Sequence, residues 1–312
     1  MHPALSVIVF TTLSGAGYGL VFLIGILTGT SLLPECRWFA FLGSGMALGM
    51  ATLGLLASTY HLGRPLRAWR AFSQWRSSWL SREGIFSLAV FAPALLLGGA
   101  WFFAGVIWGW AGWLSALLSL ITVYCTAMIY ASLRTVPRWH SGWVPLNYLL
   151  LSLMSGALML QGLLALFFAF RPEISWLSVA AILAAALAKI GYWRTIDQAR
   201  PLSTSESATG LGALGKVRLL EAPHTEENYL MREMGHAIAR KHARRLRAIS
   251  LLLAFALPLV LSLLALMFPG WPALIAAVLA AGSGMLGILV ERWLFFAEAR
   301  HAVTLYYGAA AV

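Results

Sequence analysis

One histidine and one glutamate stand near the two ends of an unusually polar segment between long apolar stretches. His61 and Glu83 are the second and the second-to-last residues of YHLGRPLRAWRAFSQWRSSWLSREG, which also holds five arginines and three tryptophans. The surroundings of an imidazole or a carboxyl group can move its pKa toward neutrality, so both groups can give and take protons near pH 7. If the two ends of the segment meet, the pair can exchange protons with a bound molecule whose oxygen atoms change protonation.

The rest of this segment favours an apolar, redox-active ligand. Its apolar residues recur at roughly helical spacing and alternate with arginines, as in a helix lying at a membrane surface: Leu66, Trp69, Phe72, Trp75 and Trp79, with arginines 64, 67, 70 and 76. A quinone needs an apolar slot with a few placed polar groups, and its oxygens need proton partners. We therefore expect a quinone headgroup between His61 and Glu83, with its isoprenoid tail between the second and third spans.

Simpler interpretations of the same residues stay open. A histidine at a membrane boundary is often only a polar tip reaching toward water. A glutamate at the start of a helix is favoured by the helix dipole, and we expect Glu83 at the start of the third span. Arginines beside a membrane often set the topology or contact lipid phosphate.

The elements that position these residues are expected to be membrane-spanning helices. Of the 312 residues, 60% are hydrophobic and only 11% are charged, against about 25% in soluble domains. Apolar runs of about 20 residues cross a bilayer as helices. The sequence therefore predicts an all-α integral membrane protein with eight spans near residues 4–28, 37–59, 85–107, 111–132, 146–169, 176–193, 248–268 and 273–295. The start, MHPALSVIVF, lacks the basic region of a signal peptide, so we assign it to a retained first span.

Two connections are long and polar, residues 60–83 and 191–247, and we interpret them as docking loops of a single anchor domain, residues 1–312. The first contains the expected interfacial helix, and in the second Thr225 is expected to cap a further helix. Basic residues concentrate in the loops on the same side as these two connections and both termini, and we include Arg292 among them. The loops on the opposite side hold only Arg37 and Arg171. Because cytoplasmic loops carry the excess of Lys and Arg, both termini are predicted to be cytoplasmic.

Several kinds of chemistry are disfavoured. None of the seven histidines lies in the middle of a predicted span, so a membrane-embedded haem with histidine ligands is not expected. Cys36 and Cys125 are too few for an iron–sulfur cluster, and the sequence has no metal-binding signature, so no metal is expected. The net charge of +11 is explained by loop residues, so we expect no nucleic-acid partner. Acids are missing from the span centres, and ionisable, interrupted spans are not evident, which counts against a transporter.

The segment from Tyr60 to Gly84 closely resembles the hallmark of the dimethyl sulfoxide reductase anchor subunit (DmsC-like) family. The eight-span layout and the loop GLGALGKVRLLEAPHTEENYLMREMG are similar to that family as well, so the resemblance covers essentially the whole chain. The same loop resembles anchors of sulfite-oxidising (SoeABC-like) complexes. The first motif is specific, and it shows no departure that would inactivate the family's site.

The resemblance implies a complex of three subunits in a bacterial inner membrane. A molybdopterin catalytic subunit would perform the substrate chemistry, and an iron–sulfur subunit would carry the electrons. The anchor would span the membrane lipids and hold both of these subunits at the membrane. It would exchange electrons with ubiquinone or menaquinone, without a haem or an iron–sulfur cluster of its own. In the family the histidine and the glutamate of this motif are implicated in quinol binding, which points to His61 and Glu83 here. From the same segment we add these residues to the expected quinone site: Gly63, Arg64, Arg67, Trp75 and Arg82.

The direction of electron flow depends on orientation. The charge bias places the expected quinone site on the cytoplasmic side, where the sulfite-oxidising relatives keep their catalytic part. We therefore expect a sulfite dehydrogenase that reduces quinone. One alternative is the anchor of an exported dimethyl sulfoxide reductase that oxidises menaquinol, and another is a purely structural anchor without a quinone site.

Overall fold

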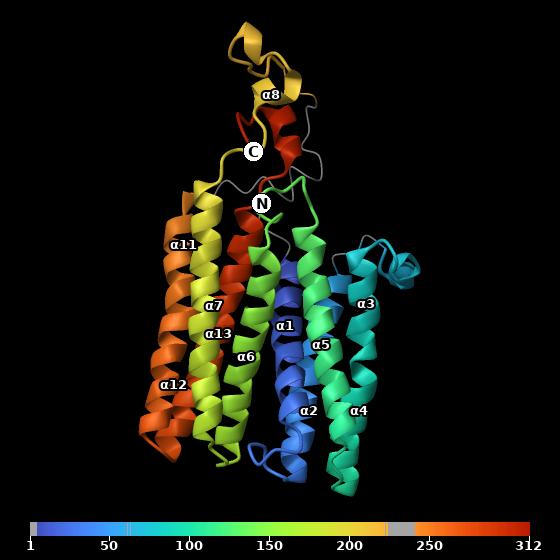
Figure 1. The fold of residues 1–312 in the computed structure, drawn as a ribbon, viewed down its shortest axis with the longest axis vertical. Helices are drawn as coiled ribbons and strands as arrows, with labels where there is room; N and C mark the ends of the chain where they lie inside the picture. The colour runs from blue at the N-terminus through green and yellow to red at the C-terminus, as the bar shows by residue number, and fades with distance from the viewer. Residues whose placement is uncertain (1–4, 61, 63, 222, 224–240) are drawn as a thin grey trace.

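Eight helices packed side by side make up the body of the molecule (Figure 1). The computed structural model of the protein describes residues 5–60, 62, 64–221, 223 and 241–312. Within these residues eight helices are long and apolar enough to cross a membrane, and no strand forms beyond one isolated bridge between Thr204 and Ala311. The prediction of an all-α membrane protein with eight spans is confirmed.

The spans consist of the following elements. The first four are α1 (Leu5–Leu27), α2 (Arg37–Thr59), the pair α3 (Trp79–Ala89) and α4 (Phe91–Gly99) with the π-helical turn η2 (Ala100–Ala104), and α5 (Gly109–Ala131). The last four are α6 (Trp143–Leu166), α7 (Pro172–Gln198), the run of α11 (Ala243–Ser250), π-helical η4 (Leu251–Ala256) and α12 (Leu257–Met267), and α13 (Trp271–Ala297). Short elements connect them: the 3₁₀ helix η1 (Pro65–Gln74), α8 (Ser205–Thr209), and the 3₁₀ helices η3 (Gly212–Leu214) and η5 (Ala302–Tyr307).

Some helices extend beyond the predicted boundaries. α3 begins at Trp79 rather than near residue 85, because the Ser78 hydroxyl caps it by accepting the Ser81 N–H at 3.4 Å. Glu83 therefore lies one turn inside the helix, and the expectation that it starts the span is wrong. α7 continues to Gln198, so helix also occupies the first residues of the expected 191–247 loop. α13 likewise extends past its predicted end, to Ala297.

Helices α1 and α6 form the centre of the bundle and join its two halves. α1 packs against α2, α5, α6 and α13, whereas α6 packs against α1, α5, α7 and α13. Where α1 crosses α6, a side chain at Gly19 or Gly156 would collide with the backbone of the other helix. The Ser152 hydroxyl of α6 donates a hydrogen bond to the Gly15 carbonyl of α1 at 2.6 Å. This crossing fixes the interior from which the candidate site is built.

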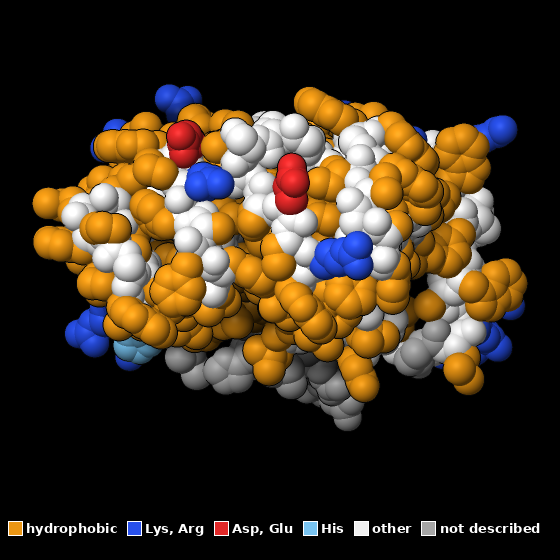
Figure 2. All heavy atoms as spheres, turned by 90° about the horizontal axis from the view of Figure 1, so that it is seen from below, with side chains coloured by type: hydrophobic (Ala, Val, Ile, Leu, Met, Phe, Trp, Pro, Cys, Tyr) orange, Lys and Arg blue, Asp and Glu red, His pale blue; other side chains and the backbone are white. Residues whose placement is uncertain are grey.

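The two ends of the bundle differ in chemistry. The start of α1, the C-terminus, residues 64–78 and residues 199–221 all lie at one end, the top of Figure 1, which we call the loop end. Figure 2 views the opposite end, where hydrophobic side chains dominate and charged ones are scattered. In or beside the connections there, Arg37 and Arg171 are the only basic residues. The basic residues of the remaining described connections therefore gather at the loop end.

Candidate functional site

Glu83 places a carboxyl group inside the bundle near the loop end. Its residue is only 5% exposed, and one carboxyl oxygen, Oε1, has no hydrogen-bond partner among the described residues. Thr126 of α5 is the polar side chain that reaches the carboxyl group. One turn further along α3, the Ser87 carbonyl accepts a hydrogen bond from the Tyr18 hydroxyl of α1 at 3.1 Å. A buried carboxyl with a free oxygen can still bind a donor or hold a proton.

The arginine-rich segment packs against the first turns of α3. The Ser81 hydroxyl donates to the Ala71 carbonyl at the end of η1 that lies nearest α3. The Phe72 ring covers α3 at Gly84, where a β-carbon would come within 3.0 Å of the ring. Glycine at this position therefore allows η1 to lie against the helix that carries Glu83.

Arg82 holds the end of this segment in place. Its guanidinium donates from Nε to the Trp75 carbonyl at 2.9 Å and from Nη2 to the Arg76 carbonyl at 2.7 Å. The same group lies over the Trp79 ring, 4.3 Å from the ring centroid. The neighbouring side chains thus differ in their contacts. Arg82 binds the segment between η1 and α3, whereas Glu83 is buried in the bundle.

The structure brings only part of the expected site together. Arg64 and Arg67 are exposed, and the Trp75 side chain is 53% exposed. Trp75 and Arg82 meet through the Trp75 backbone. His61 and Gly63 lie outside the described residues, as does the helix expected after Thr225, so the meeting of His61 with Glu83 stays a prediction.

A second group of charges, buried near the loop end, was missed from the sequence. Lys189 of α7 forms an ion pair with Glu291 of α13, and the second oxygen of Glu291 lies 3.3 Å from Nε of Arg292. All three side chains are at most 3% exposed. The assignment of Arg292 to a loop is therefore wrong, because its guanidinium lies inside the bundle over the Tyr148 ring, 3.7 Å from the centroid. The signal was the pair Glu291–Arg292 within the apolar run LGILVERWLFF.

Further ion pairs connect this group to the surface. Arg247 of α11 binds Asp197 at 2.5 and 3.0 Å and Glu298 at 2.9 Å. The Trp193 ring lies between the two groups, with the Lys189 ammonium 5.1 Å and the Arg247 guanidinium 5.2 Å from its centroid. Three helices, α7, α11 and α13, are thereby joined through charge at the loop end.

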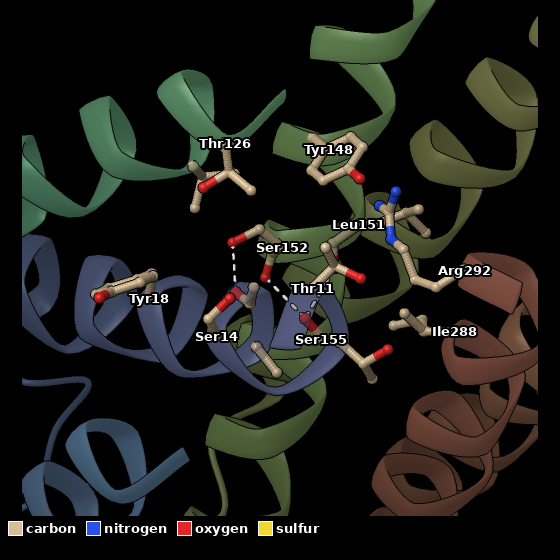
Figure 3. A pocket seen from close by; sticks show the side chains of 14 residues that line it. Thr11, Ser14, Tyr18, Thr126, Tyr148, Leu151, Ser152, Ser155, Ile288 and Arg292 are labelled. Atoms are coloured by element: carbon tan, nitrogen blue, oxygen red, sulfur yellow. Dashed lines mark hydrogen bonds between the residues drawn. The ribbon is translucent and has the colours of Figure 1, made fainter. Parts of the chain in front are cut away.

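A small cavity lined by several hydroxyl groups lies in the bundle beside the buried Arg292 side chain (Figure 3). Its volume is about 10 Å³, and α1, α5, α6 and α13 line it. Thr126 and Tyr18 stand on one side, whereas Tyr148 and Arg292 stand on the other. The cavity therefore begins at the side chain that contacts Glu83 and ends at the buried guanidinium.

No group of three or more His, Cys, Asp or Glu side chains able to hold a metal ion occurs in the described part of the protein. Cys36 is exposed and Cys125 is buried, and both are free thiols. The chemistry that the described residues offer is proton exchange by a buried carboxyl group beside an apolar, lipid-facing surface.

Comparison with known proteins identifies a family and individual relatives, one of which aligns over the whole length of this sequence. The model of the family described as DMSO reductase anchor subunit (DmsC) matches residues 1–308. The protein is 34% identical to the C subunit of sulfite dehydrogenase from Allochromatium vinosum, over 100% of both sequences. It is 33% identical to the YnfH component of an anaerobic dimethyl sulfoxide reductase of Escherichia coli, over 36% of this sequence and 40% of that one. The C component of anaerobic dimethyl sulfoxide reductase from the same organism is 31% identical, over 36% and 41% of the two sequences.

Proposed function

Because the chain belongs to the DMSO reductase anchor subunit (DmsC) family, we propose that it is the membrane anchor and quinone-reactive subunit of a three-subunit molybdopterin oxidoreductase. It holds an iron–sulfur subunit and a molybdopterin catalytic subunit on the membrane. It also provides the site where electrons pass between the iron–sulfur subunit and the quinone pool. The observation that carries this proposal is the buried Glu83 carboxyl group with one unpartnered oxygen, set at the loop end of a lipid-facing helix.

Glu83 supplies protons to the quinone in this proposal. Reduction of a quinone to a quinol consumes two electrons and two protons. The electrons come from the iron–sulfur subunit. The Glu83 carboxyl passes one proton to a quinone oxygen, after which the carboxylate takes up another proton from the aqueous side. General acid–base catalysis of this kind typically contributes about 10²–10⁴-fold to a rate. With His61 as second proton partner, the headgroup lies between the end of α2 and the start of α3.

The surfaces of α2 and α3 suit the isoprenoid tail. Leu53 and Leu56 of α2 are 58% and 53% exposed, and Leu88 of α3 is 55% exposed. An exposed apolar face on a membrane helix contacts lipid chains, and a quinone tail has the same chemistry. Arg64, Arg67 and Trp75 stand at the loop end of this face and contribute to quinone entry, while Arg82 keeps their segment in place.

The gathering of basic residues at the loop end supports a cytoplasmic location of that end, with both termini, in a bacterial inner membrane. The iron–sulfur subunit docks at the loop end, because electrons then reach the quinone without crossing a bundle. In this proposal the docking surfaces are the polar connections predicted from the sequence, residues 60–83 and 191–247, apart from the helical residues at their ends.

Full-length similarity favours sulfite as the substrate of the complex. The relative that aligns over its entire length is a sulfite dehydrogenase subunit, whereas the two dimethyl sulfoxide reductase relatives align over about 36% of this sequence. In this assignment the catalytic subunit oxidises sulfite with water to sulfate, releasing two electrons and two protons, and the electrons reduce quinone. Turnover of the purified complex with sulfite and a quinone analogue, compared with quinol and dimethyl sulfoxide, distinguishes the two substrates. Preference for the sulfoxide would reverse the assignment.

The quinone site is tested by Glu83→Gln in the purified complex. Glutamine keeps the size of the side chain but cannot exchange a proton, so quinone-linked turnover should fall at least about 100-fold while the three subunits still assemble. Reduction of an artificial electron acceptor by the partner subunits should not change. Glu173→Gln, at the exposed start of α7 on the opposite end, is the matched control. Unchanged quinone kinetics in Glu83→Gln would leave only the structural-anchor alternative.

A further inference from the structure

A cleft rich in positive charge opens at the loop end, where the ends of α7 and α13 lie near the start of α11 (Figure 1). Its volume is about 780 Å³. Asp197, Arg247 and Glu298 line it, and they are already bound to one another in the ion pairs described above. The other charged residues that line the cleft are all cations, which we call the cleft cations: Arg138, Lys241, Arg244, Arg245 and Arg300.

The cleft cations have no carboxylate of their own. None of the five forms an ion pair within the part of the chain that the structure describes. The linked ion pairs beside them hold three cations and three carboxylates, so this group supplies no spare negative charge. Because like charges gathered in one cleft repel one another, an anion bound among them would be stabilised.

Backbone contacts hold two of the cleft cations in place. The Tyr192 hydroxyl of α7 donates to the Arg138 carbonyl at 3.1 Å, which fixes Arg138 beside that helix. The Ala302 N–H donates to the Thr135 carbonyl at 2.9 Å, so the segment that carries Arg300 is tied to the connection that carries Arg138. A site whose backbone is already in place loses less conformational freedom when a ligand binds.

The cleft lies at the level of lipid headgroups. α11 begins the span Ala243–Met267, so Arg244 and Arg245 stand in the first turn of a membrane helix. Ile249 and Leu252 follow Arg245 by four and seven residues, on the same face, and they are 43% and 57% exposed. This span is the least buried of the eight, so much of its surface faces lipid chains. Basic pockets between membrane helices at this level bind anionic headgroups.

We propose that this cleft binds the headgroup of an anionic phospholipid with two phosphate groups, as in cardiolipin, and that the acyl chains lie along Ile249 and Leu252. Two phosphates match five cations better than one does, and a guanidinium can bind two phosphate oxygens at once. The exposed apolar face directly below the arginines favours a lipid over a soluble phosphate compound or an acidic segment of a partner protein. The proposal goes beyond the proposed function and does not depend on Glu83.

Lipid binding is measured on the protein purified in detergent with its associated subunits and then freed of lipid. It is titrated with cardiolipin, phosphatidylglycerol or phosphatidylcholine, and native mass spectrometry counts the lipids bound. Cardiolipin should bind most tightly, with one molecule per chain, phosphatidylglycerol more weakly, and phosphatidylcholine not measurably. Equal affinity for the three lipids, or no bound cardiolipin, would overturn the proposal.

The double variant Arg244→Gln/Arg245→Gln should weaken cardiolipin binding about 30-fold, because each basic residue near a membrane surface contributes to the attraction. Arg244→Lys/Arg245→Lys should keep most of the affinity. The matched control is Arg70→Gln/Arg76→Gln, which removes two exposed guanidinium groups at the same end but outside the cleft. The control should bind cardiolipin as the unchanged protein does. Equal weakening in both glutamine variants would show general attraction to a basic surface, and the proposed site would be lost.

Two other occupants of the cleft have distinct outcomes. Glycerol 3-phosphate and inorganic phosphate carry the same phosphate chemistry without acyl chains. If either binds as tightly as cardiolipin, the cleft is a site for soluble phosphate and the lipid proposal fails. If Arg244→Gln/Arg245→Gln releases an associated subunit while the unchanged protein binds no cardiolipin, the cleft is a protein-docking surface and the proposal fails as well. Quinone turnover enters none of these measurements, so failure of the proposed function is separately visible.

Discussion

The buried ion group predicts that two neighbouring charge removals have unequal costs. Glu291→Gln leaves the Lys189 and Arg292 cations buried without an anion, whereas Lys189→Met leaves the neutral pair Glu291–Arg292. At an effective dielectric constant of about 20, an ion pair at the 3.3 Å separation of Arg292 and Glu291 is worth about 5 kcal/mol. Breaking a buried pair typically costs about 3–5 kcal/mol after relaxation. Glu291→Gln should therefore destabilise the bundle by about that amount.

Lys189→Met should cost less, about 1–2 kcal/mol. The methionine keeps the apolar contacts of the lysine stem, and the loss is limited to one ion pair and the attraction of the ammonium to the Tyr192 and Trp193 rings, at 4.4 and 5.1 Å. Removal of the ammonium also removes its cost of burial, which offsets part of that loss. Glu291→Gln should therefore cost about 1–4 kcal/mol more than Lys189→Met.

The protein has its own reporter for this measurement. Cys125 is buried in α5 and Cys36 is exposed, so in a Cys36→Ser background a thiol-reactive dye labels the protein only when the bundle opens. Unfolding in detergent, followed by the labelling of Cys125, gives the midpoint for each variant. Equal loss in Lys189→Met and Glu291→Gln, or a larger loss in Lys189→Met, would refute this explanation of how Glu291 holds the two cations.

Two further predictions concern the loop end. Arg82→Ala should release residues 64–78 without unfolding the bundle, since it removes the bonds to the Trp75 and Arg76 carbonyls. Limited proteolysis should then cut this segment faster, and Arg82→Lys should give an intermediate rate. The pKa of His301 is lowered by burial, and its Nδ1 accepts the Val303 N–H at 3.0 Å, which only an unprotonated nitrogen can do. The unfolded segment therefore binds protons more readily than the folded one, and the stability of η5 should fall as pH drops below about 6.5. Amide exchange in residues 301–308 should then accelerate at low pH. His301→Asn, whose side chain can accept the Val303 N–H but does not titrate, should show no such acceleration.

The helical architecture could be predicted because it follows from apolar length alone. Each span is a run of about 20 apolar residues, and lipid forces such a run into a helix. The exact starts could not be predicted in the same way. The first turn of α3 is polar in sequence, but Ser78 caps it and η1 packs on it, so the helix includes Glu83.

The candidate site was only partly predictable for a physical reason. Glu83 could be found because its type and its neighbours in sequence suggest proton chemistry. Lys189 and Arg292 could not be assigned from the sequence, because a charge near the end of an apolar run can belong either to the loop or to the interior. Only packing of α7 against α6 and of α13 against α6 decides between these environments, and it brings together residues more than 100 positions apart.

The contact between α1 and α6 also has a consequence for how the protein is made. Ser152 and Gly15, which hydrogen-bond at this crossing, are 137 positions apart. At about 5–20 residues per second, ribosomes need roughly 7–27 seconds to supply the second partner after the first. During that interval the part of α1 around Gly15 and Gly19, which faces α6, has no partner. The newly made protein should therefore depend on the insertion machinery, or on provisional neighbours, until its fifth membrane segment has entered the bilayer.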